Sequence, residues 1–596
     1  MDHNPLKRKS FSPLARMMLY SSIVGVITGL GAVVFLITTH FFSAYLLAGI
    51  AGYPMSEPYG EPKLFHVHET TFHPLLLLLI TTIGGLISGF LVYTFAPEAE
   101  GHGTDAAIEA YHEKDGIIKP IVPIIKIIAS AITLGSGGSG GREGPIAQIG
   151  AGFGSFFAMR LGLSAKERRI LLVAGMGAGI GAIFHAPLAG AIFAGEVLYR
   201  EIEIESEAFI HTVIASIVAY SIFSFFFGWK PLFKTPVFHF SNPAEIFAYT
   251  VLAFSVGIFA IFYVKVFYGT RKLFNKIPIK PHFKPAIGGF LVGLIGMFVP
   301  DAVSMGYGAL QKAITASLTI KTMFLIALLK VFATSFTISS GGSAGVFGPS
   351  MVIGGALGGA IGMFIHSISP TLVSQPGAFA LVGMVGFFSA AANTPFSTIV
   401  MVTEMTGNYH LIIPSIWCAG IGYLVAQKWT IYEKQVQNRR HSKAHYYEYA
   451  RDLLEEIKVS DIMHSQYNWV RPYTSLKKIF ELFSNIKDDD LLVIDELNRL
   501  AGIVSIKTVR HLLPERSLHN IVVAEDLSTD KILTTTLDED VHSLLHRIGF
   551  KDINVIPVVD KADPTRVLGI VKRRDIIRAY NEAKSQIVAH VSSQAD

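Results

Sequence analysis

Long apolar segments dominate the chain from about residue 12 to residue 430, and charged residues become frequent only after Lys434. A helix needs roughly 20 mostly apolar residues to span the hydrocarbon core of a bilayer. The pattern therefore predicts a multi-pass integral membrane protein. The predicted spans, of which the last two are short, cover residues 17–47, 75–95, 208–227, 246–267, 285–298 and 411–426.

Other apolar segments are interrupted by glycine and proline, and broken helices at membrane depth are tolerated only where they line a cavity or are buried in protein. We therefore expect the permeation site among them. These segments also contain an internal repeat, because Pro187 precedes Glu196 by the same number of positions as Pro395 precedes Glu404. Chance similarity of glycine-rich runs is the weaker alternative. The broken segments are residues 121–134, 170–198, 325–339 and 352–403.

The residues after Tyr432 have the pattern of a soluble protein. A charged linker covers 434–458, and short β-branched runs then alternate with amphipathic helices, as in an α/β domain. Residues 491–513 resemble residues 554–577, and each copy predicts a strand, a turn, a Gly-Ile-Val strand and a helix. A further helix is expected before each copy, near 476–483 and near 541–548.

Basic residues indicate which parts of the chain face the cytoplasm. Lys7, Arg8, Lys9 and Arg16 precede the first span, and further lysines and arginines lie between 268 and 284. Basic loops stay on the cytoplasmic side of a membrane. We therefore expect both chain termini in the cytoplasm.

Composition excludes several other classes of protein. The 596 residues are 51% hydrophobic and only 16% charged, with a formal net charge of +5 and no basic stripe for a nucleic acid. Cys418 is the one cysteine, so neither a disulfide framework nor a cysteine zinc site is expected. No P-loop, HExxH or GxSxG motif is present, and we expect no enzyme, catalytic residue or required cofactor. A metal site at His66, His68 and His73 is a minor alternative.

Two glycine-rich runs have the composition of an anion site. Gly141–Pro145 and Gly345–Pro349 each place glycines directly before a proline that opens an apolar helix. Free N–H groups and the macrodipole at a helix N-terminus attract an anion without a full positive charge. Each run could therefore direct backbone amides at one dehydrated anion.

Glu143 stands within the first of these runs. A carboxylate about 4 Å from an anion is repelled by roughly 4 kcal/mol at an effective dielectric constant near 20. Such a group is expected to act as a gate that leaves when it is protonated or displaced. The alternative is a surface salt bridge between Glu143 and Arg142.

These motifs resemble those of the CLC chloride channels and chloride/proton exchangers. GREGP at 141–145, GVFGP at 345–349, FHAPLAG at 184–190 and VTEMTGNY at 402–409 carry the resemblance, which covers roughly residues 12–435. It implies a homodimer with one anion pathway per subunit. The implied fold is an all-α polytopic membrane domain of two inverted-topology repeats with tilted and broken helices.

The resemblance also implies site residues. Glu143 would be the gate, the amides of Val346 and Phe347 would hold the central anion, and Tyr432 would coordinate it. An interfacial aromatic anchor is the alternative for Tyr432. The full set of expected anion-binding residues is His102, Gly103, Arg142, Gly144, Gly345, Val346, Phe347 and Tyr432.

Two positions depart from the family pattern. His102 replaces an anion-coordinating serine; its imidazole could bind the anion and make transport depend on pH, or it turns away and a backbone amide acts instead. Val197 stands at the position of the internal glutamate that passes protons in exchangers, and valine cannot bind a proton. The neighbouring residue, Glu196, precedes a charged segment and could have a structural role only.

The tail resembles a tandem pair of CBS domains, which often bind adenine nucleotides (ATP, ADP or AMP). The nucleotide signature is incomplete in both copies: Ser505 is present but Thr508 replaces an aspartate, and Asp575 is present but Lys572 replaces a hydroxyl. A structural dimerisation platform is the alternative. The expected boundaries are 1–11 for a cytoplasmic segment, 12–433 for transport, 434–458 for the linker, and 459–515 and 516–596 for the soluble α/β CBS module.

Taken together, the sequence predicts chloride or similar halide transport through a glutamate-gated pore with CBS regulation. Val197 favours a passive channel. A chloride/proton antiporter is the alternative, and a membrane-bound nucleotide sensor is a distant one.

Overall fold

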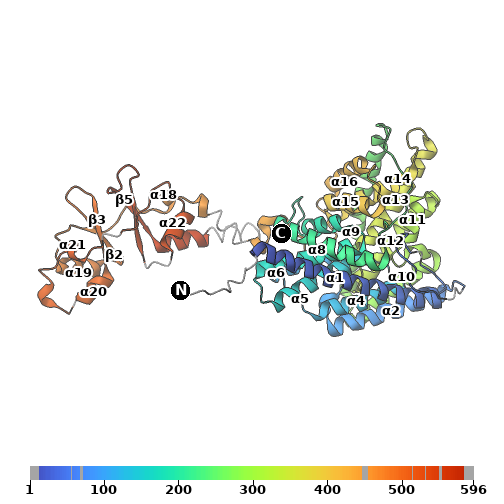
Figure 1. Ribbon diagram of the computed structural model, residues 1–596, viewed down its shortest axis with the longest axis horizontal. Coiled ribbons are helices and arrows are strands. Elements are labelled where there is room, and N and C mark those ends of the chain that lie inside the picture. The colour runs from blue at the N-terminus through green and yellow to red at the C-terminus, as the bar shows by residue number, and fades with distance from the viewer. Residues whose placement is uncertain are drawn as a thin grey trace, which may run out of the picture. The chain divides into compact units, whose positions relative to one another are not determined.

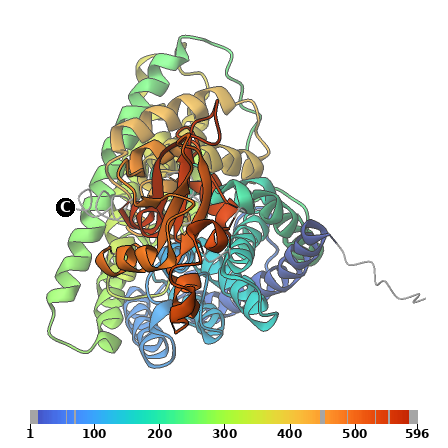
Figure 2. The same ribbon diagram turned by 90° about the vertical axis from the view of Figure 1, so that its left-hand side faces the viewer.

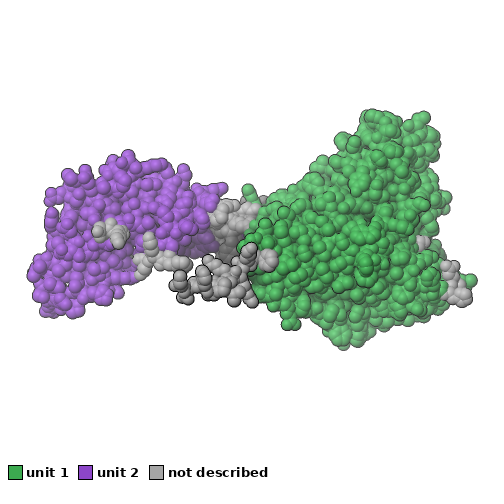
Figure 3. Space-filling model, in the orientation of Figure 1, with its two compact units in different colours: residues 1–444 green, residues 445–596 purple. Residues whose placement is uncertain are grey.

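The structure is a computed structural model that describes residues 12–55, 57–67, 71–445, 454–486, 488–512, 514–529, 532–549 and 553–582. The chain forms two compact units, Met1–Ala444 and His445–Asp596, shown in green and purple in Figure 3. The first, the membrane unit, is helical, and the second, the tail unit, contains the β-strands.

The first half of the membrane unit begins with a long apolar helix. Pro13 opens it directly after Ser12, whose side chain accepts a hydrogen bond from the amide of Ala15 at 3.2 Å, a usual way to start a helix. The elements of this half are α1 (Pro13–Ser43), η1 (Ala44–Ile50), α2 (Pro74–Phe95), η2 (Pro97–Ala99), α3 (Thr104–Glu113), α4 (Ile121–Gly135), α5 (Glu143–Arg160), α6 (Ala165–Ile183), α7 (Pro187–Glu196) and α8 (Ser206–Phe227).

From α10 onward, the second half repeats the order of elements that begins at α2 in the first half. Its elements are α9 (Glu245–Lys276), η3 (Pro281–Phe283), α10 (Lys284–Phe298), η4 (Pro300–Ala302), α11 (Tyr307–Ile314), α12 (Ile320–Ser339), α13 (Phe347–Ile368), α14 (Pro376–Ala392), α15 (Pro395–Thr406) and α16 (Ile412–Ala426), followed by η5 (Arg439–His441) and η6 (Lys443–His445). Figure 1 shows α1, α2, α4 and α5 (blue to cyan) on one side and α11, α13, α14 and α16 (yellow-green to orange) on the other, and Figure 2 keeps the two groups apart.

The helices that could cross a membrane differ in part from the predicted spans. Among the described residues six helices are long and apolar enough: α1 with η1, α2, α8, α9, α12 and α13. The spans predicted at 285–298 and 411–426 are the 15-residue helices α10 and α16, which are too short to cross on their own. Conversely, α12 and α13 lie in segments that the glycines and prolines predicted to be broken.

Glycine allows α13 to pack closely against its neighbour α14. A Cβ at Gly354 would lie 2.5 Å from the carbonyl oxygen of Gly383 in α14, so the two helices touch through their backbones. Gly150 of α5 and Gly175 of α6 form the same kind of contact in the first half. Small residues at such crossings allow close helix packing in membranes.

The tail unit contains two similar halves. In the first, β2 (Asp490–Ile494) pairs antiparallel with β3 (Leu500–Ser505) and parallel with β1 (Trp469–Val470); in the second, β4 (Val555–Val559) pairs antiparallel with β5 (Val567–Lys572). This is the predicted order of strand, turn, Gly-Ile-Val strand and helix. The helices are α18 (Val459–Ile462), α19 (Leu476–Asn485), α20 (Ile506–Leu512), η7 (Arg516–Leu518), α21 (Ala524–Leu527), α22 (Val541–Ile548) and the helical residues 573–582.

Candidate functional site

The two glycine-rich runs meet in the middle of the membrane unit. The amide of Gly141 donates to the carbonyl of Gly345 at 2.7 Å, and the amide of Gly345 donates back to Gly141 at 2.6 Å. A Cβ at Gly345 would lie 2.8 Å from the amide nitrogen of Gly144, so a larger residue would separate the runs. Their meeting brings the N-termini of α5 and α13 together.

A small cavity lies where these helix starts converge, and we call it the inner cavity. Glu143 and Gly144 of α5, Phe347 of α13, Thr104 at the start of α3 and Tyr432 line it together. Because the free amides and macrodipoles of helix N-termini attract anions, this arrangement suits an anion. The rest of its wall is apolar: Ile180, Phe184, Phe193 and Met401.

The carboxylate of Glu143 lies at the N-terminus of α13. It accepts a hydrogen bond from the backbone amide of Gly348 at 3.1 Å and another from the hydroxyl of Tyr307. Glu143 is only 3% exposed. The carboxylate thus uses an amide of the glycine-rich run that would otherwise be free for an anion.

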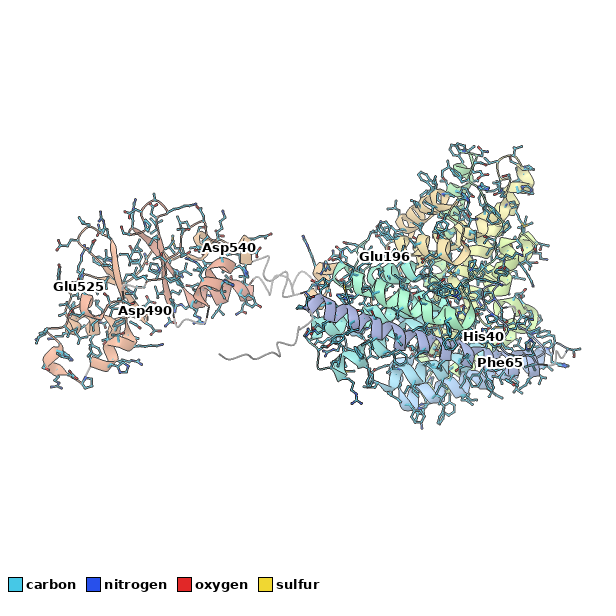
Figure 4. All side chains as sticks on the ribbon, in the orientation of Figure 1. His40, Phe65, Glu196, Asp490, Glu525 and Asp540 are labelled. Carbon is cyan, nitrogen blue, oxygen red and sulfur yellow. The ribbon has the colours of Figure 1, made fainter. Side chains whose placement is uncertain are left out.

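Arg142 points away from the inner cavity. Its guanidinium pairs with Glu61, with a hydrogen bond of 2.9 Å between Nη1 and Oε2, and it lies 5.5 Å from the ring of Tyr307. Both members of the pair are buried. The alternative salt bridge between Arg142 and Glu143 is therefore replaced by a bond to a loop residue that the sequence did not single out. His40, labelled in Figure 4, lies 3.4 Å from Glu61.

Tyr432 is buried at 1% exposure, a position that does not suit an interfacial anchor. It lies outside any helix, and its amide donates to the hydroxyl of Thr430 at 3.1 Å. The amide of the preceding residue, Ile431, donates to the carbonyl of Ala391 at 2.8 Å. These two bonds, one to a loop hydroxyl and one to a helix carbonyl, place the Tyr432 side chain against the inner cavity.

His102 does not line the inner cavity. It lines a larger cavity, the vestibule, together with Glu100, Asp105, Arg271 and Glu433. Its Nε2 lies 3.1 Å from Oδ2 of Asp105, and its ring lies 5.4 Å from that of Tyr432. The vestibule also contains Glu98, Gly101, Gly103, Ala106, Glu109, Lys114, Phe267, Ile338, Ser339 and Lys434.

Thr104 supplies a hydroxyl to the inner cavity that sequence reasoning missed. Gly103 precedes it with a φ of +84°, and Gly306 precedes Tyr307 with a φ of +79°. In each half a left-handed glycine therefore turns the chain into a short helix whose first residue carries a hydroxyl. The sequence pattern that could have predicted this is a glycine directly before a hydroxyl-bearing residue, Thr104 in one half and Tyr307 in the other.

Val197 is buried at the C-terminal end of α7. The neighbouring Glu196, labelled in Figure 4, accepts hydrogen bonds from the amides of Phe396 and Ser397 at 2.9 and 2.8 Å, and from the Ser397 hydroxyl at 2.5 Å. It therefore caps the N-terminus of α15.

Glu404, at the matching position of the second half, caps α7 in return. Its carboxylate accepts hydrogen bonds from the amides of Ala189 and Leu188 at 2.9 and 3.4 Å. The two glutamates of the sequence repeat thus form a reciprocal pair of helix caps, because each one caps the short helix that carries the other.

Two buried lysines hold the loops that lead into the site. Lys126 of α4 donates to the carbonyls of Gly101 and Ala99 at 2.8 and 2.9 Å, and Lys330 of α12 donates to the carbonyl of Ser304 at 2.6 Å. These loops precede α3 and α11. The available signal was a lysine within each of the broken apolar segments 121–134 and 325–339.

The candidate nucleotide residues of the tail unit lie in both of its halves. Ser505 ends β3 and Thr508 is exposed on α20, whereas Lys572 pairs with Asp488 at 2.5 Å and Asp575 with His464 at 2.9 Å. Burial raises the pKa of Asp488, but the hydrogen bond and charge of Lys572 outweigh it and lower that pKa. Both second-copy residues are therefore engaged within the protein.

A metal site finds no support among the described residues, where no group of three or more histidine, cysteine, aspartate or glutamate side chains could hold an ion. His68 lies outside the described residues.

Comparison with known families agrees with this geometry. A family model described as voltage gated chloride channel matches residues 84–427, and the CBS domain model matches 459–515 and 523–582. The chain is 30% identical over 430 residues to an H(+)/Cl(-) exchange transporter ClcA of Salmonella paratyphi B, covering 69% of this chain and 85% of the relative. It is 29% identical over 353 residues to a putative chloride channel protein ClcB-like of Ralstonia nicotianae, covering 59% and 82%.

Solved structures show the same fold. A slow cyanobacterial Cl-/H+ antiporter superposes with a TM-score of 0.60 at 23% identity, covering 70% of this chain and 95% of that one. A eukaryotic CLC transporter superposes with a TM-score of 0.58 at 17% identity over 94% of this chain and 98% of that one. The chain belongs to the voltage-gated chloride channel (CLC) family and carries two CBS domains after its helical membrane domain.

Proposed function

We propose that the protein exchanges chloride for protons across a membrane, with Glu143 as the group that both ions require. The observation that carries this proposal is the bond between the Glu143 carboxylate and the amide of Gly348. A chloride ion would need the same helix N-terminus. Protonation removes the negative charge that holds Glu143 there, so proton binding and anion entry become linked at one site.

Relatives favour exchange over the passive channel that Val197 suggested. Proteins of Salmonella and Cronobacter with 29–30% identity are named H(+)/Cl(-) exchange transporters, although the Ralstonia relative is named a putative chloride channel. A passive chloride channel remains the second candidate, supported by the valine at 197.

The proposed anion site uses backbone amides and two hydroxyls. Val346 and Phe347 at the start of α13 and Gly144 of α5 supply the amides, while Tyr432 and Thr104 supply hydroxyls at the inner cavity. The amide of Gly345, which the sequence also suggested for the anion, is instead bonded to the carbonyl of Gly141 and holds the two runs together. Arg142 is paired with Glu61 and does not enter the cavity. Gly103 allows the α3 start to approach, because a Cβ there would lie 2.8 Å from the carbonyl oxygen of Gly144.

The test is flux measured on purified protein in liposomes that carry a chloride gradient. Exchange predicts that chloride efflux drives proton uptake and that a proton gradient shifts the reversal potential. Glu143→Gln should abolish proton flux while chloride still moves, because glutamine keeps the shape but cannot titrate. Glu207→Gln, on an exposed part of α8, is the matched control and should behave as wild type. Chloride movement without any proton flux in the wild type would instead establish the channel.

The proposal includes the oligomeric state of the protein and the orientation of its termini across the membrane. Apolar side chains of α8 and α16 are exposed, including Ile210, Ile217, Ile413 and Ile416. We expect these faces to form the contact of a homodimer in the bilayer, with both termini in the cytoplasm.

We further propose that the transport domain ends near residue 433. The two CBS domains, residues 459–515 and 516–596, are proposed to regulate transport. An adenine nucleotide is the proposed ligand, with Ser505, Thr508, Lys572 and Asp575 as its candidate contacts. Titration of the full chain with labelled ATP tests this, since binding must be lost in Asp575→Ala and kept in the exposed-surface control Asp538→Ala.

A further inference from the structure

His102 lies where the vestibule approaches the inner cavity. It lines the vestibule, its ring is 5.4 Å from that of Tyr432, and Tyr432 lines the inner cavity with Glu143. His102 is only 5% exposed. One imidazole thus stands between the larger polar cavity and the gate.

The environment of His102 defines which ring nitrogen can take a proton. Nε2 lies 3.1 Å from Oδ2 of Asp105, and Oδ1 of the same carboxylate accepts from the amide of Lys434 at 3.2 Å. A fixed carboxylate partner keeps the imidazole proton on Nε2 and the lone pair on Nδ1. Nδ1 is buried and has no hydrogen-bond partner among the described residues. Buried polar atoms are normally paired, so this nitrogen is available for a ligand.

The charges around the vestibule suit a proton. Carboxylates of Glu98, Glu100, Glu109 and Glu433 line it in addition to Asp105. The cations there are Lys114, Arg271 and Lys434, and all three are paired with Glu109 or Glu433. Acidic groups are therefore in excess, so a cation that enters the vestibule meets net negative charge.

The two glutamates of the sequence repeat are already engaged as helix caps. The carboxylate of Glu196 is held by three donors of α15 as a helix cap, and Glu404 has the same role at α7. A proton on Glu196 would weaken these bonds. The proton route therefore needs another group on this side of Glu143.

We propose that His102, oriented by Asp105, transfers protons between the vestibule and Glu143; the proposal rests on the exchange proposed above. Nδ1 takes a proton from hydronium in the vestibule, leaving water and an imidazolium that Asp105 balances. When the Glu143 side chain leaves the amide of Gly348 for the inner cavity, the proton passes from Nδ1 to its carboxylate. The products are neutral imidazole and a neutral carboxylic acid. Asp105 is a positioning residue in this scheme.

The experiment measures proton and chloride flux together in liposomes containing the full chain. His102→Asn, which cannot titrate, should lower the ratio of proton to chloride flux about tenfold or more, and His102→Ser should do the same if the asparagine variant does not fold. Asp105→Asn should lower the ratio less and move half-maximal proton flux to a more acidic pH. His211→Asn, a buried histidine of α8 bonded to Ser21, is the matched control and should keep the wild-type ratio.

The outcomes separate this proposal from exchange itself. A wild-type ratio in both His102 variants overturns the role of His102 and leaves exchange standing, and weaker chloride binding at an unchanged ratio makes His102 an anion ligand only. Loss of proton flux in Glu196→Gln with His102→Asn unaffected assigns the route to Glu196. Absence of proton flux in the wild type overturns exchange and this proposal together.

Discussion

Glu143 shows how few side-chain and backbone contacts hold the central carboxylate of the candidate site. Its carboxylate is held by one amide and one hydroxyl, so the free energy of moving it depends on two identifiable bonds. The hydroxyl belongs to Tyr307, which also lines a pocket with His40, Glu57 and Asp301. Tyr307 therefore lies between that pocket and the carboxylate of Glu143.

Tyr307→Phe should make the gate easier to open. A hydrogen bond to a charged group contributes about 1.5–3 kcal/mol, so its loss should favour the displaced carboxylate roughly 10-fold or more. Chloride efflux from liposomes at neutral pH should rise accordingly. Tyr249→Phe, a buried tyrosine stacked on Phe379, is the control and should leave efflux unchanged. Equal rates in the two variants would contradict the role assigned to Tyr307.

Glu61→Gln should be strongly destabilising, because it leaves the buried guanidinium of Arg142 without its counter-charge. Breaking a buried ion pair by removing one partner costs about 3–5 kcal/mol. The exposed pair between Lys166 and Glu207 offers a contrast, and Glu207→Gln should cost less than about 1 kcal/mol. Thermal unfolding of the detergent-solubilised chain measures both. Similar melting temperatures for the two variants would show that the buried pair contributes little.

At the scale of elements, the candidate site depends on short helices whose ends are held in place by other parts of the chain. α7 and α15 each begin at a proline and end near a glutamate that caps the other helix. α3 and α11 each begin after a left-handed glycine whose preceding loop is held by a buried lysine. The helix N-termini are thereby fixed in position, as an anion site of backbone amides requires.

Glu404→Ala and Glu196→Ala should destabilise the protein by similar amounts. Each removes a cap from one short helix, and a lost cap costs about 0.5–2 kcal/mol. Melting temperature measured for each variant, with Glu207→Ala as the surface control, tests the expectation. A large effect of one variant and none of the other would show that the two caps are not equivalent.

At the scale of the whole molecule, the exposed apolar faces of α8 and α16 require lipid or protein around them. A contiguous apolar surface on a membrane protein is satisfied by either, so the dimer is a separate expectation. In mild detergent we expect a protein mass of twice the 64.9 kDa of one chain.

Ile217→Trp combined with Ile416→Trp should shift that mass toward the single chain, because bulky side chains on the two faces prevent close contact. Light scattering coupled to gel filtration reports the mass free of detergent. Phe254→Trp, on an exposed face of α9, is the control and should remain dimeric. A monomeric wild type would contradict the proposed dimer.

Sequence alone determined the membrane character, the internal repeat, the two helix starts marked by glycine and proline, and the strands of the tail unit. These follow from local composition and period, since apolar length decides whether a helix can span and glycine before proline marks a helix start. The tertiary structure showed that the two glycine-rich runs meet, and it decided which side chains share a cavity. Thr104 faces the inner cavity while His102 faces the vestibule, two positions apart on one turn, because α3 begins between them. Arg142 pairs with Glu61 across 81 positions, and such a partner is set by how distant segments pack rather than by any local pattern.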